Sequence, residues 1–367
     1  MRGLFGEACE HPVHPVNHRM EHHRLGTESS ATDPAGHPYT GAAAPGRIGP
    51  LGAAIIDNPH SGRNRRHNPV AGQAARHQNL RIREAVTPHD VKGALLDLAD
   101  SPPDLVIVNG GDGTAQSVMR MLLEHRPFPH QPLVAILPAG TTNMTAGDIG
   151  MRGNRLRALN RLLDWAERPG PEMSVMTRPV LRVRSPLETR PLYGMFFGAS
   201  AVLQGIRFCR AEIHSRGIKG ELGPALATAR LVLDQIFGRS KHLRSEPITL
   251  QADEGPAQDI DSLVLVVSAL DRLFLGLRPF WNSRHGALHL TLIRDRPEHL
   301  LRVLPALLRG RHHPMLTPEH GYLNQGIREL RLSLDGGFTL DGELHESDSA
   351  RGPLLIDSGG ELNFVRP

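Results

Sequence analysis

Between residues 51 and 167, short apolar runs alternate with segments whose apolar residues recur every three or four positions. The runs predict strands, and the periodic segments, such as 89–99 with Val91, Leu95 and Leu98 on one face, predict helices. We expect strands at 51–57, 80–86, 104–109 and 132–138, and helices at 89–99, 115–124, within 139–147, and at 153–167. Strands that alternate with helices in this way indicate βαβ units and a parallel sheet.

From about residue 175 the pattern changes to strands in which apolar and polar positions often alternate, which is typical of an antiparallel sandwich. Strands are expected at 180–184, 192–199, 248–252, 263–269, 287–293, 330–334 and 338–340, with helices at 221–237 and 297–309. The predicted fold class is α/β in two domains, a Rossmann-like parallel α/β domain at 51–174 and an antiparallel β-sandwich domain at 175–367. Residues 1–50, rich in Pro, Gly and His, are expected to be a disordered extension.

Composition and charge limit the kinds of partner that we expect for this protein. The 367 residues include 39% apolar and 4% aromatic residues, which is enough for two ordinary cores. The net charge of +4 comes mostly from arginines scattered among acids, so we expect no nucleic-acid partner. Two cysteines, Cys9 and Cys209, give no disulfide framework and favour a reducing cytoplasm. We expect neither a secretory signal nor a membrane span, so any membrane contact is expected to be peripheral.

The loop Gly-Gly-Asp-Gly-Thr at 110–114 follows the predicted strand 104–109 directly. Glycines let the backbone approach a ligand closely, and a glycine loop that opens a helix offers free N–H groups and a positive helix end to a phosphate. Asp112 would repel a bare phosphate, which indicates a divalent cation or a polar group between them. The alternative is an ordinary strand-to-helix turn with a capping Asp or Thr.

Three further segments carry polar or acidic groups at strand ends. Asn-Pro-His-Ser-Gly at 58–62 follows the first predicted strand, and Pro-Ala-Gly-Thr-Thr-Asn at 138–143 follows the fourth, with side chains able to bond a nucleotide. In a parallel sheet, loops at strand C-termini converge on one cleft. Near the C-terminus, Asp341-Gly-Glu343 places two carboxylates around a glycine at a strand end, a pattern whose commoner use is a β-turn.

Together these segments resemble the diacylglycerol kinase catalytic-domain family, bacterial lipid kinases related to sphingosine and ceramide kinases. The resemblance covers about residues 51–367 and is strongest over the first domain and at residues 341–343. It implies a nucleotide-binding α/β domain followed by a β-sandwich domain, with the active site between them. It also implies transfer of the γ-phosphate of ATP, with Mg²⁺, to the hydroxyl of diacylglycerol or a similar lipid alcohol at a membrane surface.

The resemblance also implies roles for individual residues. Asp341 matches the general base, Glu343 would support it or the metal, and Asp112 would be linked to Mg²⁺. The residues expected to bind the nucleotide are Asn58, Ser61, Gly62, Thr87, Gly110, Gly111, Asp112, Gly113, Thr114, Thr141 and Asn143.

Three acidic positions common in that family are absent. Met144 stands where many members have Asp, residues 175–181 contain no carboxylate, and Arg284-His285 stands where an Asp pair often supports a structural Mg²⁺ site. Asp148 could replace the first only from the same helix face. These departures leave open a non-catalytic homologue that binds nucleotide or lipid. A kinase of a soluble acceptor such as NAD also shares the Gly-Gly-Asp-Gly-Thr loop.

Two segments have alternative interpretations. The basic amphipathic helix 153–167 could touch anionic lipid, but domain packing is the favoured interpretation. The apolar segment 273–281 could form a lipid entrance, but a place in the core of the second domain is favoured. The sequence does not fix an oligomeric state, and a homodimer is one option.

Overall fold

The computed structural model describes residues 50–366 except 69, 71, 73–75, 78–79, 141–142, 152, 208–243 and 283–285. Several expectations lie outside the described residues: the extension before residue 50, Cys9, Cys209, Thr141, the helix at 221–237 and the pair Arg284-His285. Within the described part of the chain, no helix is long and apolar enough to cross a membrane.

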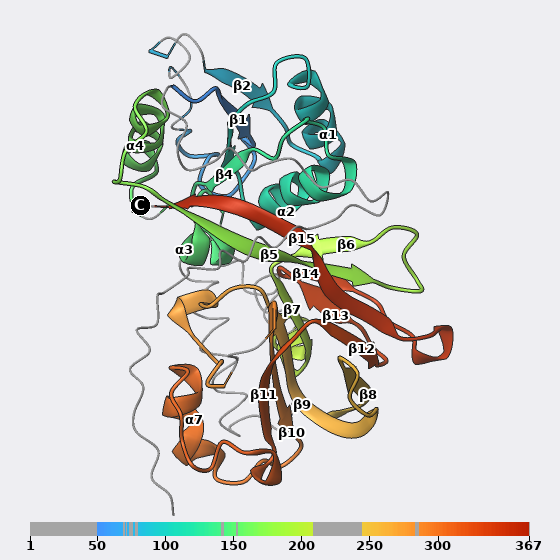
Figure 1. Cartoon of the computed structure of the whole chain (residues 1–367). Helices are drawn as coiled ribbons and strands as arrows, with labels where there is room; N and C mark the ends of the chain where they lie inside the picture. Colours follow the sequence, from blue (N-terminus) through green and yellow to red (C-terminus); the bar gives the residue numbers. More distant parts are fainter. Residues whose placement is uncertain are drawn as a thin grey trace, which may run out of the picture. The chain divides into compact units, whose positions relative to one another are not determined.

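The N-terminal part is a parallel sheet flanked by helices (Figure 1). Its strands, in the spatial order β2-β1-β3-β4, are β1 (Ala53–Asp57), β2 (Arg81–Glu84), β3 (Leu105–Asn109) and β4 (Leu133–Ile136). Its helices are α1 (Pro88–Asp97), α2 (Asp112–Arg120), α3 (Met144–Ile149) and α4 (Arg155–Glu167), and a π-helical turn, Met121–His125, continues α2. The order of strands reverses between β1 and β3, which is where ligands bind in such sheets.

Alternate residues of these strands face two different cores. Ala54 and Ile56 of β1 pack in one cluster with residues of α1 and α2, whereas Ile55 packs in a second cluster with Leu159 and Leu162 of α4. This alternation is the period-2 geometry of a strand buried on both faces. The apolar face of α4 therefore packs against the sheet, which confirms the interpretation of this helix as a packing helix.

The C-terminal part consists mainly of antiparallel strands, which confirms the predicted fold class. They are β5 (Ser174–Arg184), β6 (Leu192–Gly194), β7 (Phe196–Ser200), β8 (Glu246–Ala252), β9 (Gln258–Ser268), β10 (Leu288–Arg294), β11 (Tyr322–Ile327), β12 (Glu329–Ser333), β13 (Phe338–Leu340), β14 (Glu343–His345) and β15 (Leu354–Arg366). Helix α7 (Leu300–Leu308) packs through Val303 and Leu307 against β9 and β10. Short 3-10 turns occur at η2 (Phe274–Gly276), η3 (Pro318–His320) and η4 (Ser349–Arg351).

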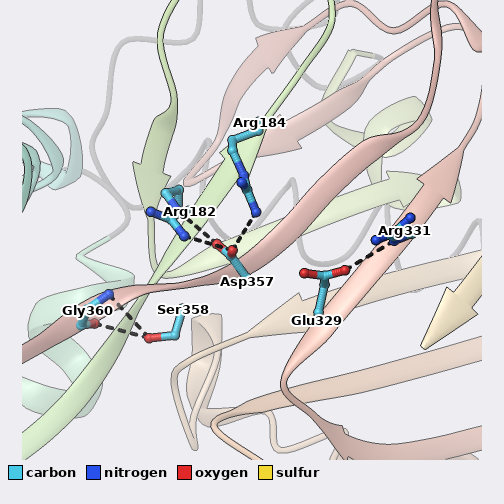
Figure 2. A network of polar contacts seen from close by, with 7 residues as sticks. All are labelled: Arg182, Arg184, Glu329, Arg331, Asp357, Ser358 and Gly360. Atoms are coloured by element: carbon cyan, nitrogen blue, oxygen red, sulfur yellow. Dashed lines mark hydrogen bonds and ion pairs between the residues drawn. The ribbon is translucent and has the colours of Figure 1, made fainter. Parts of the chain in front are cut away.

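The final strand, β15, joins the two parts and was not among the predicted strands. It pairs antiparallel with β5 and β12 and parallel with β4, through Phe364 and Val134. On β15, Asp357 lies opposite Arg182 and accepts two hydrogen bonds from its guanidinium, at 2.9 and 2.8 Å, and a third from Arg184 (Figure 2). This bidentate pairing with Asp357 raises the pKa of Arg182.

Two boundaries differ from the prediction in ways that affect the site. Helix α2 begins at Asp112 rather than Ala115, so the glycine loop includes the first helical turn. The predicted strand 192–199 is divided at Met195 into β6 and β7.

Candidate active site

The loops after β1, β3 and β4 meet at one end of the parallel sheet. The Asn58 Nδ2 group donates to Thr114 Oγ1 at 3.0 Å, and the backbone N–H of Arg63 donates to the carbonyl oxygen of Ala139 at 3.0 Å. The Asn58 Nδ2 group also approaches the carbonyl oxygen of Val86, next to Thr87, at 3.4 Å. The predicted convergence of these loops is therefore present.

Two glycines allow this close approach. A Cβ atom on Gly110 would lie 2.5–2.7 Å from the Thr114 side chain, and one on Gly140 would lie 2.9 Å from the Cα atom of Gly111. Contacts this short are incompatible with any side chain. The loops after β3 and β4 thus touch through their backbones, beside the N-terminal end of α2.

Asn109, the last residue of β3, joins the strand end that precedes the glycine loop to β1 and the loop after it, and was not among the predicted site residues. Its Nδ2 group donates to Asp57 Oδ1 at 2.8 Å and to Asn68 Oδ1 at 3.0 Å. Its carbonyl oxygen accepts from the backbone N–H of Asn58 at 3.0 Å. Burial raises the pKa of Asp57, against the two hydrogen bonds that lower it. A polar residue at the end of an otherwise apolar strand was the signal that could have identified Asn109.

Asp341 and Gly342 form the two-residue turn of the β13–β14 hairpin, in which Leu340 pairs with Glu343. Both residues have positive φ, 50° and 91°, as hairpin turns of the I′ class require and as Asp-Gly favours. The turn interpretation is therefore correct, but the Asp341 carboxylate does not face outward. Its Oδ1 accepts from the backbone N–H of Phe196 at 2.9 Å, and both oxygens accept from that of Met195, at 3.1 and 3.0 Å.

The surroundings of Asp341 favour its protonated form. Burial and the negative charges of Asp112 and Glu343 raise its pKa to about 8, against the two backbone N–H groups that lower it. Gly194 makes room for the carboxylate, because a Cβ atom there would lie 2.6 Å from Asp341 Oδ2. The sequence analysis missed Gly194, which stands at the break between β6 and β7.

Glu343 connects this hairpin with the glycine loop. Its Oε1 atom lies 3.5 Å from the position of a Cβ atom built on Gly113, and Asp112 is close enough to influence the pKa of Asp341. The structure thus brings together Asp112, Asp341 and Glu343 from the two ends of the chain. Among the described residues, no three His, Cys, Asp or Glu side chains are arranged to hold a metal ion by themselves. Mg²⁺ commonly takes one or two carboxylates, with water and substrate phosphate as the remaining ligands, and Asp112 fits that kind of site.

Several predicted nucleotide contacts have structural partners within the chain. The Thr87 hydroxyl accepts from the backbone N–H of Asp90 at 3.2 Å and caps α1, in a capping box with the Asp90 side chain. Asn143, with φ 47°, closes the loop after β4 through hydrogen bonds of 2.7 and 2.6 Å with Gly140. The Ser61 hydroxyl donates to the carbonyl oxygen of Asn58 at 3.0 Å, and Gly62 lies in the same turn.

Asp148 follows Met144 by one turn of α3 and so lies on the same helix face, as replacement of the missing carboxylate requires, but its own carboxylate already has a partner. It is buried, and its Oδ2 atom accepts from the backbone N–H of Asp271 at 2.9 Å. It therefore anchors the segment after β9 to α3. Asp112 instead has the backbone N–H of Thr145 near its Oδ1 atom, at 3.4 Å.

Comparisons with known proteins relate this arrangement to a family. Residues 52–175 match the family model of the diacylglycerol kinase catalytic domain, and no curated protein shows a significant match. A solved structure from Bacillus anthracis str. Sterne, named "a putative diacylglycerol kinase", has a TM-score of 0.60 and 18% identity, covering 88% of this chain and 97% of its own. A second, named as a diacylglycerol kinase, has a TM-score of 0.54 and 15% identity, covering 86% and 96%. A third has a TM-score of 0.56 and 17% identity, covering 86% and 98%.

At these identities the solved structures establish a shared fold. The resemblance found in the sequence is confirmed: residues 52–175 match the diacylglycerol kinase catalytic domain, and the chain shares its fold with those Bacillus anthracis proteins.

Proposed function

We propose that this protein is an ATP-dependent lipid kinase that transfers the γ-phosphate to the hydroxyl of diacylglycerol or a similar lipid alcohol. The observation that carries the proposal is the position of Asp341. Two backbone N–H groups fix its carboxylate beside Asp112, which belongs to the glycine loop that opens α2. The family match over residues 52–175 supports kinase chemistry in general. The lipid acceptor is inferred from the family name.

In this proposal Asp341 is the general base. Its carboxylate accepts the proton of the acceptor hydroxyl while the hydroxyl oxygen forms a bond to the γ-phosphorus and the bond to the ADP oxygen breaks. A base with a pKa of about 8 is ionised in only about a tenth of the molecules at pH 7, but in that form it binds the proton more strongly than an ordinary carboxylate, which assists the transfer. Glu343 influences the charge on Asp341 and is assigned a supporting role.

The glycine loop and its neighbours would bind the nucleotide. Phosphoryl transfer depends mainly on positioning and charge neutralisation. The backbone N–H groups at the start of α2 are suited to phosphate oxygens, and Asp112 would hold Mg²⁺, which neutralises phosphate charge when bound. The remaining proposed nucleotide residues are Asn58, Ser61, Gly62, Thr87, Gly110, Gly111, Gly113, Thr114, Thr141 and Asn143. A cytoplasmic location, with peripheral contact to the membrane that holds the acceptor, goes with this assignment.

A second candidate function is nucleotide or lipid binding without catalysis. Asp148 favours it, because its carboxylate binds a backbone N–H group and leaves the Met144 position without an acidic substitute. The raised pKa of Asp341 favours the kinase, since a buried carboxylate beside two like charges costs stability and has a chemical use in proton transfer.

One assay separates these functions. The purified chain is incubated with γ-labelled Mg·ATP and diacylglycerol, monoacylglycerol, sphingosine, ceramide or NAD, and labelled products are identified. The proposal predicts label in a lipid, and loss of that label in Asp341→Asn. Label in NAD alone contradicts the lipid assignment. Saturable ATP binding without product from any acceptor supports the non-catalytic alternative.

A further inference from the structure

Helix α7 has a surface chemistry unlike that of the other helices. Its buried face consists of Val303, Leu304 and Leu307. On the opposite side, Leu301 has 67% of its surface exposed, the highest value among the exposed large apolar residues of the described chain. A single exposed leucine is normal on a protein surface, so what sets Leu301 apart is the charge that shares its helix face.

Arginines provide that charge. Arg302 and Arg309 lie with Pro305 on the exposed side of α7, since positions separated by three, four or seven residues share a helix face. Exposed Arg311 follows the helix, and exposed Arg278 is attached to its end, because its backbone N–H donates to the carbonyl oxygen of Leu308 at 2.9 Å. We call this set the α7 face: Arg278, Leu301, Arg302, Pro305, Arg309 and Arg311.

The nearest acidic residue along the chain, Glu298, lies before α7 and pairs with His320 at 2.8 Å. Segments 272–282 and 300–313 contain five arginines, two histidines and no Asp or Glu. Within the described residues, no ion pair joins an acidic side chain to Arg278, Arg302, Arg309 or Arg311. Their charge is therefore available to a partner of negative charge.

The α7 face is linked to the candidate active site through the segment 272–281. The Trp281 indole N–H donates to the carbonyl oxygen of Leu316 at 3.3 Å, which fixes the far end of this segment to the loop that follows α7. At its near end, Asp271 is held by Asp148 of α3, and η2 also contacts α3. Helix α3 carries Thr145, whose backbone N–H lies near Asp112.

We propose that the α7 face is the surface by which this protein docks on an anionic lipid bilayer. The proposal rests on the proposed lipid-kinase function for its purpose, but its physical basis is separate. Arginines around one exposed leucine suit the headgroup region, where the cations meet lipid phosphates and the apolar group enters the acyl boundary. One exposed leucine is too little apolar surface for a stable interface between copies of the chain, which needs about 800 Å² on each partner.

Co-sedimentation of the full chain with vesicles tests the proposal without any kinase reaction. The wild type should bind phosphatidylglycerol–phosphatidylcholine vesicles, bind pure phosphatidylcholine much more weakly, and release as salt is raised. The triple variant Arg302→Gln, Arg309→Gln, Arg311→Gln should bind anionic vesicles on the order of 100-fold more weakly, since each arginine contributes roughly a five-fold effect. Leu301→Gln should weaken binding by about ten-fold.

Helix α4 provides a matched control. It also carries exposed arginines, but its Leu156 is 37% exposed against 67% for Leu301, and Asp164 and Glu167 lie on the same helix. The variant Arg157→Gln, Arg161→Gln, Arg168→Gln removes the same charge and should bind vesicles within two-fold of the wild type. Equal losses in both triple variants would overturn the proposal in favour of general electrostatic attraction.

Two further results bear on the proposal. Unchanged vesicle binding by the α7 triple variant would overturn it. The proposal is also overturned if the wild type is a dimer and the triple variant is a monomer that still binds vesicles. Specific loss of vesicle binding supports the docking surface even if the wild type phosphorylates no lipid, an outcome that would reject only the proposed function. If lipid is phosphorylated, the α7 triple variant should lose activity on vesicles but keep its rate on a short-chain acceptor in detergent.

Discussion

The two halves of the candidate site are held in place by different means. On the parallel side, each functional group lies within a few residues of a strand end, and backbone contacts such as that between Gly111 and Gly140 fix the loops. On the antiparallel side, Asp341 is a turn residue whose carboxylate is fixed by Met195 and Phe196, about 145 residues earlier in the chain. The parallel side of the site is therefore determined mainly by local sequence, whereas the antiparallel side depends on tertiary contacts between distant parts of the chain.

This difference predicts that the two halves contribute to different steps, nucleotide binding and phosphoryl transfer. Damage to the loops of the parallel side should reduce nucleotide affinity, because those loops offer backbone N–H groups at the start of α2. Damage around Asp341 should reduce the rate of transfer and leave nucleotide affinity unchanged. Each prediction below tests that separation.

Apart from Asp341→Asn, the largest effect is expected from Gly140→Ala. Its Cβ atom would lie 2.9 Å from the Cα atom of Gly111, a backbone contact that side-chain movement cannot relieve. Overpacking of this kind costs about 1–3 kcal/mol, which corresponds to roughly 5- to 150-fold in ATP affinity if the loop opens. Isothermal titration with ATP and Mg²⁺ measures it. Gly93→Ala, where no atom lies within 4 Å of the new Cβ, is the control and should bind ATP normally.

The pH dependence should come from the antiparallel side. Asp341 must be ionised to accept a proton, and its pKa in the free protein is about 8. The value of kcat/KM should therefore rise about ten-fold per pH unit well below pH 8 and level off above it, which amounts to roughly 50-fold between pH 6 and 8. A flat profile of kcat/KM between pH 6 and 8 would show that ionisation of Asp341 does not control the reaction. ATP affinity measured over the same range should not follow this curve.

A smaller effect is expected from Gly194→Ala. The new Cβ atom would lie 2.6 Å from Asp341 Oδ2 and displace the carboxylate from its N–H donors. Misplacement of a catalytic group by about 1 Å costs up to about 100-fold in rate. We expect kcat to fall by roughly 10- to 100-fold while the Kd for ATP stays within two-fold. Loss of ATP affinity in this variant would show that the halves are not separable.

The smallest effect on catalysis is expected from Asp148→Asn. The amide oxygen can still accept from the backbone N–H of Asp271, so kcat should change by less than about three-fold. Asp148→Ala leaves that N–H unpaired and should lower the free energy of unfolding by about 1–3 kcal/mol. If the Asn variant loses most of its kcat while its stability is unchanged, this would show that Asp148 has the acidic role that Met144 cannot take.

The sequence allowed the parallel half to be predicted almost completely. Its strands are short apolar runs, its loops are marked by glycine and asparagine, and strand C-termini in a parallel sheet share one edge. The Thr87 hydroxyl, which was expected at the nucleotide site, also caps α1 within the chain, a contact that was not predicted.

The antiparallel half could be predicted only in part. The Asp-Gly turn could be recognised from the sequence. The pairing of Asp341 with Met195 and Phe196 could not be predicted, because any residue except proline can supply a backbone N–H donor. Strand β15 was missed because Ser358, Gly359 and Gly360 interrupt its alternation, where its register with β5 also shifts. Irregular strands of this kind are specified by their neighbours rather than by their own period.

The most direct test of the account measures kcat and the Kd for ATP in Asp341→Asn, with the lipid acceptor identified by the labelling assay. Removal of a general base that acts on a bound nucleotide predicts that kcat falls by about 10²- to 10⁴-fold while the Kd for ATP stays within two-fold. A variant that retains the wild-type kcat would contradict the claim that the antiparallel part supplies the catalytic base.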